Sequence, residues 1–521
     1  MRQGYGPHTR ESSAESGPTR SIPSKCLIGA PLVRQRGSRG RPGAGRARDR
    51  GLAGIMIDGL IGGLEGIARE ALMFAGVGFL IGGIDDLAVD FIYLFRRGWR
   101  WRPDRMASAD AVALDLCPRL AVFVPAWDEA AVIGSMLQAA LARFEYPDYR
   151  IYVGVYPNDR ATIDAVAAVA AGDARVRLVV NDRPGPTTKA DNLNALWHAL
   201  CRDEASAEQA GGAPATQAIV LHDAEDLVHP QELHVYARLI GIYDAVQLPV
   251  RPLIDARSRL VSGHYADEFA EAHAKQLVVR EALGAAMPLA GVGCAVARVT
   301  LSRIASARGG NPFDAHSLTE DYELGLAVAA TGGRGILARV AAPGGAGLVA
   351  VAAYFPATLD AAVRQKARWM TGIALAGWDR VGWGRPLDIA EHWMRMRDRR
   401  APLAVLVLGA AYVGLVAWAL AFAGRWASGT QPVALPAPDW LLATNAMLLG
   451  WRLLVRAGFT RAHYGWREAL WSVPRAFVGN LIALLAARRA ITRYIAMLRG
   501  GAPVWDKTAH DFPDFARAPP S

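Results

Sequence analysis

The residues whose types and spacing best suit chemistry follow the apolar run AIVL in the stretch AIVLHDAED, residues 218–226. Three carboxylates, Asp223, Glu225 and Asp226, fall within four residues and repel one another unless water or a cation screens them. Carboxylate oxygens of this kind hold hard divalent cations, which in turn neutralise phosphates. The competing interpretation is a solvated strand end, because aspartate is common in turns. The stretch is therefore a candidate metal site.

A second acidic group lies in SLTEDYELGLAVAATG, residues 317–332. Ser317 and Glu320 have the spacing of a capping box, and acidic residues suit the N-terminus of a helix. This pattern predicts a helix that begins near Asp321, and it would occur on any helix of this kind.

A third group, Gln365, Arg368 and Trp369, has the spacing i, i+3 and i+4 and therefore shares one face of a helix. On an amphipathic helix near a membrane such a triplet is unremarkable by itself. Lys189 opens another predicted helix, where it either reaches the site or lies on the surface.

The elements that must position these groups alternate between strand and helix, which predicts an α/β domain with a parallel sheet and helices on both faces. Ligands bind such sheets at the carboxyl ends of the strands, where the three carboxylates fall. The predicted strands are 119–126, 149–157, 176–182 and 218–226, and the predicted helices between them are 128–144, 161–171 and 188–201.

Apolar segments bracket this domain. Residues 402–424 hold 23 residues without a charge, which is long enough to cross a bilayer. Further candidates are 71–84, 438–459, and 471–487, which contains Pro474 and Arg475 and for which an interfacial position is favoured over a full crossing. Basic flanks at both ends of the middle region place it in the cytoplasm.

The formal net charge of +10 at first indicates an acidic partner, but residues 1–50 carry 11 Lys or Arg and 3 Asp or Glu, which is +8 of the total. The remainder is nearly balanced, so a nucleic-acid partner is not expected. The 1–50 segment has no hydrophobic period and is predicted to be disordered. The cysteines, Cys26, Cys117, Cys201 and Cys294, form no CxxC pair, which argues against a structural zinc.

Five motifs in order carry a family resemblance: PAWDE (125–129), KADN (189–192), DAED (223–226), TED (319–321) and QKARW (365–369). Together, between membrane segments, they resemble a membrane-embedded family 2 glycosyltransferase of the synthase type, with the GT-A fold, a Rossmann-like domain inserted between transmembrane helices. Within that family the chain is similar to the inner-membrane phage-adsorption-protein group, through YPNDRAT, RPGPTTKADNLN, LHDAEDLVHP and YADEFAEAHAKQLVVREAL. The resemblance covers about residues 70–515.

The resemblance implies an inverting transfer. Asp321, with Glu320 beside it, matches the catalytic position, where Asp321 would be the general base for an acceptor hydroxyl. Asp223 and Glu225 match the metal-binding pattern for Mg or Mn, with Glu225 in place of the usual aspartate. Asp226 is a further candidate ligand, which would share this role with Glu225.

The resemblance also implies two binding regions. Gly291, Gly293 and Trp369 fall on the acceptor side. A segment at 501–513 with Lys507 and His510 resembles a cover for the active site, or is a polar tail. The donor-binding residues implied are Ala126, Glu129, Asn158, Asp159, Lys189, Asp223, Gln365 and Arg368, and "YPND" leaves Asn158 and Asp159 as alternatives.

The sequence thus predicts a multi-pass protein of the bacterial inner membrane that moves a sugar from a nucleotide-sugar donor, a UDP-sugar foremost, to a growing glycan, exopolysaccharide or other envelope acceptor. The alternatives are transfer of a single sugar to a lipid carrier and a non-catalytic envelope scaffold that serves phage adsorption. Partners would be the lipid bilayer and envelope export proteins. The expected divisions are a basic tail (1–55), a membrane segment (56–100), a cytoplasmic GT-A domain (106–400), transmembrane or interfacial helices (401–500) and a cytoplasmic tail (501–521).

Overall fold

The computed structural model describes residues 52–99, 117–212, 215–343, 347–432, 434–501 and 512. The predicted tail at 1–50, and Lys507 and His510 of the predicted cover, lie outside these described residues.

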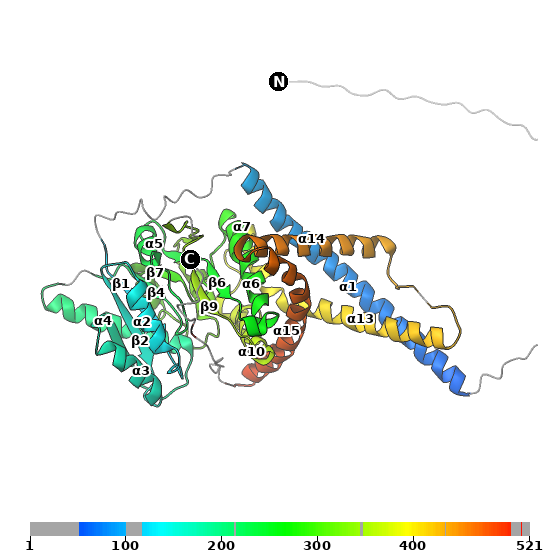
Figure 1. Ribbon diagram of the computed structural model, residues 1–521, viewed down its shortest axis with the longest axis horizontal. Coiled ribbons are helices and arrows are strands. Elements are labelled where there is room, and N and C mark those ends of the chain that lie inside the picture. The colour runs from blue at the N-terminus through cyan, green and yellow to red at the C-terminus, as the bar shows by residue number, and fades with distance from the viewer. Residues whose placement is uncertain are drawn as a thin grey trace, which may run out of the picture. The chain divides into compact units, whose positions relative to one another are not determined.

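A seven-stranded sheet forms the centre of the domain, with the strand order β3-β2-β1-β4-β7-β5-β8 (Figure 1). The four predicted strands lie next to one another and are all parallel. The chain order reverses between β1 and β4, which is where open sheets of this kind bind ligands. The strands are β1 (Leu120–Pro125), β2 (Tyr149–Val155), β3 (Val176–Val180), β4 (Ala218–Leu221), β5 (Ala245–Gln247), β7 (Cys294–Ala297) and β8 (Gly335–Leu337).

The sheet is mixed rather than wholly parallel. Strand β7 pairs antiparallel with β4, through Leu221 and Cys294, and antiparallel with β5. The prediction of a parallel sheet therefore holds for every strand of this sheet except β7, because β5 and β8 pair parallel with each other and run in the direction of β4. The alternation of strand and helix continues through β5, and only later does a helical excursion, residues 261–282, return the chain to the sheet in the opposite direction as β7.

The sheet is buried on both faces, as parallel strands require. Val122, Val124 and Val220 belong to one apolar cluster, whereas Phe123 and Leu221 belong to the other. The helices of the domain are α2 (Ile133–Arg143), α3 (Arg160–Ala170), α4 (Lys189–Gln209), α5 (Glu232–Leu239), α6 (Val261–Glu271), α7 (Leu277–Ala282), α8 (Arg298–Ala307), α9 (Glu320–Ala330), α10 (Leu359–Trp369), α11 (Gly377–Val381) and α12 (Ile389–Arg399).

Two of the helical segments that reach the site are interrupted by π-helical turns, which are frequent at functional sites. Segment η3 (Ala272–Gln276) follows α6, and η5 (Met370–Ala376) follows α10 immediately after Trp369. A second sheet of two parallel strands, β6 (Val250–Leu253) and β9 (Val351–Tyr354), supports the same region. A 3-10 turn, η2 (Ala256–Ser258), precedes α6.

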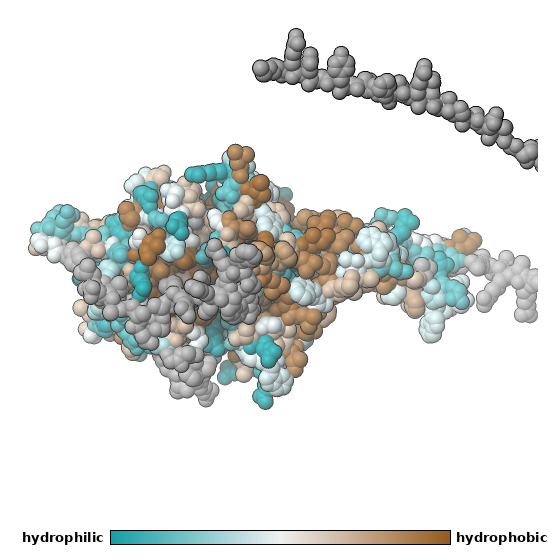
Figure 2. Space-filling view, turned by 90° about the horizontal axis from the view of Figure 1, so that it is seen from above, coloured by the Kyte–Doolittle hydropathy of each residue, from teal (hydrophilic) through white to brown (hydrophobic). Residues whose placement is uncertain are grey.

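Four long helices make up the rest of the chain: α1 (Leu52–Trp99), α13 (Ala401–Ala427), α14 (Asp439–Tyr464) and α15 (Trp466–Leu498). Three of them are long and apolar enough to cross a membrane, namely Gly54–Arg96 of α1, all of α13 and all of α15. Their exposed side chains are largely apolar, and the hydrophobic colour gathers over them in Figure 2.

These helices differ in detail from the predicted segments. The segment at 71–84 is part of a helix of 48 residues. The segment at 438–459 is helical but does not reach the apolarity of a span, since Arg452 and Arg456 interrupt it. The segment at 471–487 lies in a helix that is long and apolar enough to cross a membrane, although it contains Pro474.

Helix α15 is nevertheless tied to the domain, and Figure 1 shows it beside α6 and α10. Arg475 is fully buried, with Nη1 3.2 Å from Asp267 Oδ1 of α6, and it also pairs with Glu468. A buried arginine needs such carboxylate partners. The opposite side of α15 carries exposed apolar side chains, including Leu470, Phe477 and Leu498.

Candidate functional site

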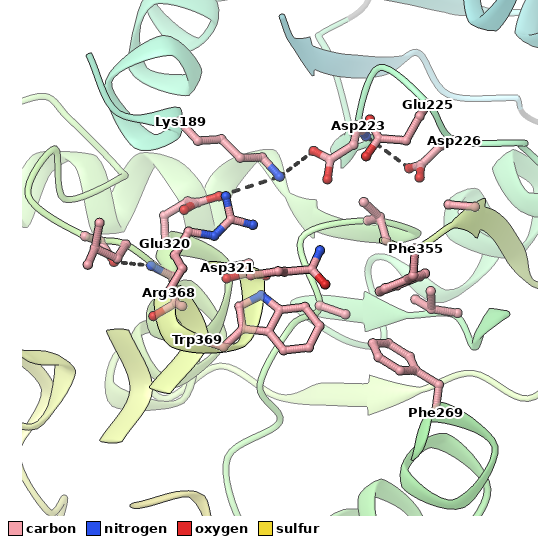
Figure 3. Close-up of a pocket in the computed structure, with 18 of the residues that line it drawn as sticks. Lys189, Asp223, Glu225, Asp226, Phe269, Glu320, Asp321, Phe355, Arg368 and Trp369 are labelled. Carbon is pink, nitrogen blue, oxygen red and sulfur yellow. Dashed lines mark hydrogen bonds and ion pairs between the residues drawn. The ribbon is translucent and has the colours of Figure 1, made fainter. Parts of the chain in front are cut away.

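An open cavity lies at the carboxyl end of β4, between the sheet and helices α9 and α10. It collects most of the predicted catalytic, metal and phosphate-binding residues from four separate parts of the chain. Its lining includes Lys189, Asp223, Glu225, Asp226, Phe269, Glu320, Asp321, Phe355, Gln365, Arg368 and Trp369 (Figure 3).

Lys189 joins the two acidic groups of the cavity. Its Nζ lies 2.5 Å from Asp223 Oδ1 and 3.7 Å from Glu320 Oε1. Thr188 caps α4 by accepting from the backbone N–H of Asp191, which fixes the start of the helix that carries the lysine. Burial would lower the pKa of Lys189, but Asp223, Glu320 and Asp321 outweigh it and hold that pKa above its usual range. The lysine is therefore a fixed cation between Asp223 and Glu320.

Asp226 has a different environment from its two acidic neighbours. Its Oδ2 lies 2.9 Å from His222 Nδ1 and accepts from the backbone N–H of Asp223 at 3.0 Å. The other ring nitrogen of His222 lies 2.7 Å from Glu232 Oε1. Burial would lower the pKa of His222, but Glu232 and Asp226 raise it to about 10. The resulting buried ionic triad holds the turn after β4 and commits the Asp226 carboxylate to a structural contact.

The residues before α9 do not form the predicted capping box. Helix α9 begins at Glu320, and Thr319 at its N-cap makes no side-chain cap hydrogen bond. The Ser317 hydroxyl instead donates to Glu323 Oε1 at 2.7 Å, because Glu323 is the residue that faces back toward it. Glu323 also pairs with Arg380. Glu320 is thereby left to face Lys189 and the cavity.

Asp321 lies half-buried on the cavity wall beside the loop 288–293. A Cβ built on Gly291 would lie 2.6 Å from Asp321 Oδ2, so only glycine fits here. The φ of Gly291, +76°, also favours glycine, because other residues rarely adopt this backbone conformation. Burial, with the nearby charge of Glu320, raises the pKa of Asp321 to about 7 against the opposing effect of Lys189. A carboxyl group with this pKa is suited to accept a proton at neutral pH.

Helix α10 presents Gln365, Arg368 and Trp369 on one face toward the cavity, as their spacing predicts. Within the described part of the chain, Gln365 Oε1 and Arg368 Nε are buried without a hydrogen-bond partner. Buried polar atoms are nearly always paired, so these two atoms are available to a ligand.

Aromatic side chains form the wall of the cavity beside Trp369. The ring centroid of Phe269 lies 5.0 Å from that of Phe355 and 6.3 Å from that of Trp369. Figure 3 shows these rings on the side of the cavity away from Lys189 and Asp223. The cavity thus has a charged end and an aromatic end.

The two predicted acceptor-side glycines differ in position. Gly291 touches Asp321, whereas a Cβ on Gly293 would meet Val351 of β9 at 2.8 Å. Gly293 therefore allows close packing of the loop on the small sheet and does not face Asp321.

The predicted nucleotide-end residues lie at the carboxyl ends of β1 and β2 and not in the cavity lining. Asp159 caps α3 and accepts from the backbone N–H of Asp128. Asn158 exchanges two hydrogen bonds with the backbone of Gly185, at 2.7 and 2.8 Å. Ala126 and Glu129 are buried. The ends of β1 and β2 are joined by the hydrogen bond between Asp128 and Asp159, and they lie one and two strands away from the end of β4 that carries Asp223.

Sequence reasoning missed Phe269 and Phe355 as lining residues. Phe269 falls in YADEFAEAHAKQ, a stretch that carries the family resemblance but gives no role for the ring. Phe355 follows β9, a short strand with no periodic signal, and only the folded chain brings it to the site.

The charge of the cavity fits a divalent cation. Five lining carboxyl groups face two lining cations, Lys189 and Arg368. No group of three or more metal-ligating side chains occurs within the described residues. A cation here would take its remaining ligands from water and a diphosphate, which is the usual habit of Mg²⁺. Asp223 and Glu225 fit such a partial set of ligands, although Asp223 Oδ1 contacts Lys189, and Asp226 Oδ2 contacts the buried His222.

The mixed α/β sheet carries acidic residues where its strand order reverses, which is a ligand-binding position, and comparison with known families identifies the class of domain. Residues 118–372 match the family described as Glycosyltransferase like family 2. Residues 118–372 therefore form a family 2 glycosyltransferase domain, and the predicted α/β fold class is confirmed.

Among individual proteins, the chain is 35% identical over 479 residues to the Bacteriophage adsorption protein B of Escherichia coli, and equally to a Bacteriophage N4 adsorption protein B from a second strain. The match covers 86% of this chain and 63% of each relative, so the chain spans less than two thirds of the length of these curated relatives. The predicted similarity to the phage-adsorption-protein group is confirmed.

Two solved structures are similar in outline. A mannosyltransferase from Pyrobaculum calidifontis, in complex with GDP-Man and Mn²⁺, matches 82% of this chain and 99% of its own with a TM-score of 0.46 and 18% identity. The Staphylococcus aureus protein TarS, residues 1–349 in complex with UDP-GlcNAc, matches 66% of this chain and 93% of its own, with a TM-score of 0.29 and 11% identity.

Proposed function

We propose that this chain is an inverting glycosyltransferase of the bacterial cytoplasmic membrane. It takes a sugar from a nucleotide-sugar, a UDP-sugar foremost, in the presence of Mg²⁺ or Mn²⁺, and transfers it to a glycan of the cell envelope or an exopolysaccharide. The observation that carries the proposal is that one lysine, Lys189, joins Asp223 to Glu320, so that the metal end and the base end of a single cavity are held next to each other.

The charged end of the cavity is the place for the donor diphosphate. Asp223 and Glu225 would hold the cation, which when bound neutralises charge on the leaving diphosphate. Lys189 and Arg368 add positive charge at the same place, and the unpaired Arg368 Nε and Gln365 Oε1 meet polar groups of the donor.

The aromatic end is the place for the acceptor. A sugar ring has an apolar face that packs on aromatic rings such as Trp369 and Phe355, and its hydroxyl groups turn toward the polar wall. Gly291 lets the backbone approach closely beside Asp321.

Asp321 then performs the proton transfer. The acceptor hydroxyl oxygen forms a bond to the anomeric carbon, the bond from that carbon to the diphosphate oxygen breaks, and the hydroxyl proton passes to Asp321. Because attack and departure occur on opposite sides of the carbon, one base suffices and the configuration inverts. Glu320 keeps the pKa of Asp321 high enough for it to hold the proton.

The proposed placement has the domain (106–400) in the cytoplasm, helices 56–100 and 401–500 in or along the membrane, and a cytoplasmic tail from 501. Basic residues on both flanks of the domain support this orientation. The similarity to phage adsorption proteins supports an envelope acceptor and a role with envelope export proteins.

A test of the proposal is sugar-nucleotide turnover by membranes that contain the chain. A panel of UDP- and GDP-sugars is assayed for released nucleotide and labelled product, with and without EDTA, for the native chain and for Asp223→Asn. Asp164→Asn, an exposed aspartate of α3, is the matched control. We expect one donor to turn over, EDTA and Asp223→Asn to abolish it, and the anomeric configuration to invert.

Product size separates the possibilities within this function. A polymer favours a processive enzyme, whereas a lipid extract with one added sugar favours transfer to a lipid carrier. Nucleotide binding without turnover of any donor would contradict the proposal and favour a non-catalytic envelope scaffold.

A further inference from the structure

Helix α14 is too short in its uncharged part to cross a bilayer. Between Asp439 and Arg452 it has 12 uncharged residues, which span about 18 Å at 1.5 Å per residue. The hydrocarbon core of a bilayer is about 30 Å thick. Helix α13, by contrast, has 24 residues without a charge between Arg400 and Arg425, or about 36 Å.

Helices α1 and α13 run antiparallel, and their contacts define which residues lie at the same level along the bundle axis. Gly78 lies against Val407, Leu72 against Gly414, and Ile61 against Gly424.

Ion pairs join α1 to α13 at both ends of this antiparallel pair. Arg400 pairs with Asp85 and Asp86 at 2.5 and 2.6 Å, and Arg425 pairs with Glu65 at 2.8 Å. From Glu65 to Asp85 is 20 residues along the helix, which is about 30 Å. The two levels of charge therefore have the spacing of the two surfaces of the hydrocarbon core.

Helix α14 first contacts α1 about half-way between the levels of Glu65 and Asp85. A Cβ on Gly76 would lie 2.9 Å from Leu441, and Asn445 Nδ2 donates to the Gly76 carbonyl at 2.9 Å. From there α14 runs parallel to α1, with Leu448 against Gly83, until Arg452 meets Asp86 at 3.2 Å. Gly76 lies between the levels of Leu72 and Gly78, which face the middle of α13. Helix α14 thus covers only the half of α1 on the side of Asp86.

The start of α14 consequently places polar groups at mid-depth. Asp439 is exposed, and its carboxylate has no ion pair within the described part of the chain. The N-cap, Pro438, supplies no side-chain cap for the first N–H groups of the helix. A charged group in the middle of a bilayer costs about 3 kcal/mol on insertion scales. Non-helical backbone at that depth is tolerated only inside protein or beside water.

The half of the bundle on the side of Glu65 has one further sign of hydration. Arg69 and Glu70 pair with each other there at 3.0 Å and are 69% and 76% exposed. No charge interrupts α1 from Gly76 to Ile84, the half that α14 covers.

We infer that the half of the bundle on the side of Glu65 and Arg425 holds a water-filled recess, which is bounded by α1, α13 and the start of α14 and reaches to about Gly76. Its contents are water and, in the proposed function, a hydrated uncharged chain such as a glycan. The part of the membrane still to be crossed is then the nine residues from Gly76 to Asp85, about 14 Å. Only the cargo and the extracytoplasmic location of the opening rest on the proposed function.

The test is the reactivity of single cysteines toward a charged, membrane-impermeant methanethiosulfonate added outside intact spheroplasts. Asp439→Cys tests the recess. Val413→Cys is the matched control, because it lies next to Gly414 at nearly the same depth, is apolar and is 56% exposed on α13. Ser428→Cys, beyond Arg425, gives the rate in open water. The native chain, with its own cysteines, is the blank.

We expect Asp439→Cys to react within about tenfold of Ser428→Cys, because a thiol must ionise in water to react. Val413→Cys should react at least about a hundredfold more slowly, because a thiol in hydrocarbon stays protonated. If Asp439→Cys is as slow as Val413→Cys, lipid or a helix of another chain fills the space and the inference is wrong. If Val413→Cys is as fast as Ser428→Cys, the assigned depth is wrong.

Each variant is first compared with the native chain for its amount in membranes and its melting temperature in detergent. Should Asp439→Cys fail to accumulate, Trp440→Cys, 62% exposed at the same helix start, takes its place with the same expected rates. Because labelling needs no turnover, failure of the proposed function and failure of the recess are separate outcomes.

Discussion

Gly291 and Asp321 are in direct contact: a Cβ on the glycine would lie 2.6 Å from Oδ2 of the aspartate. The backbone of the acceptor-side loop thereby fixes one side of the proposed base. The contact joins the loop before β7 to the start of α9, two segments that are about 30 residues apart in the sequence.

Gly291→Ala should displace the Asp321 carboxylate and lower kcat by about ten- to a hundredfold, since small misplacements of a catalytic group have large effects. Gly284→Ala is the control, because its φ of +73° matches the +76° of Gly291 but its Cβ would meet nothing within 4 Å. The control should lose about 1 kcal/mol of stability from backbone strain and keep its turnover rate. Equal loss of kcat in both variants would show that strain, and not contact with Asp321, is responsible.

The pH dependence of turnover should report the ionisation of Asp321. Only the ionised carboxylate accepts a proton, so kcat/KM should rise with pH through a midpoint near the raised pKa of about 7. Glu320→Gln removes a negative neighbour that raises this pKa, and the midpoint should therefore move to lower pH. Asp164→Asn should leave the midpoint in place. A midpoint that does not move in Glu320→Gln would mean that another group titrates.

The acidic turn after β4 should divide into metal ligands and a structural residue. Glu225→Gln should weaken activation by Mn²⁺ and raise the Mn²⁺ concentration for half-maximal activity by about ten- to a hundredfold. Asp226→Asn should instead lower the melting temperature, because it removes the partner of the buried His222 at a cost of about 3 kcal/mol. The pattern is contradicted if Asp226→Asn changes the metal requirement and leaves the melting temperature unchanged.

Attachment of α15 to the domain should depend on Arg475. Arg475→Met leaves Asp267 buried without its cation and should cost about 3–5 kcal/mol in unfolding monitored in detergent. Arg461→Met, an exposed arginine of α14, should change stability by less than about 0.5 kcal/mol. Adding Asp267→Leu to Arg475→Met should recover part of the loss, because the unpaired charge is then gone. No recovery would indicate that packing, and not charge, holds the helix.

The local parts of the fold could be predicted from the sequence. Strands β1 to β4 and helices α3, α4 and α10 follow from apolar runs and spacing, and the face that carries Gln365, Arg368 and Trp369 follows from helix geometry. The acidic turn at 223–226 was a candidate because like charges seldom cluster after a buried strand without cause.

The rest depends on contacts between distant segments, which spacing does not encode. Ser317 bonds Glu323 rather than Glu320, because Glu323 is placed by Arg380, 57 residues further along the chain. Strand β7 is antiparallel because of the path of the chain after β4. Phe269 and Phe355 reach the cavity from α6 and from the end of β9. Neither the approach of Gly291 to Asp321 nor the contact of the start of α14 with Gly76 has a local signal.

The most direct test of the central claim is single-turnover transfer by the native chain and by Asp321→Asn, with donor binding measured in the same preparations. Asparagine keeps the shape of the side chain and cannot accept the proton. We predict that transfer falls by about 10²- to 10⁴-fold while the donor Kd changes by less than about threefold, since Asp321 acts on the acceptor. Native-like transfer by Asp321→Asn would contradict the account, because the residue would then be only the start of a helix.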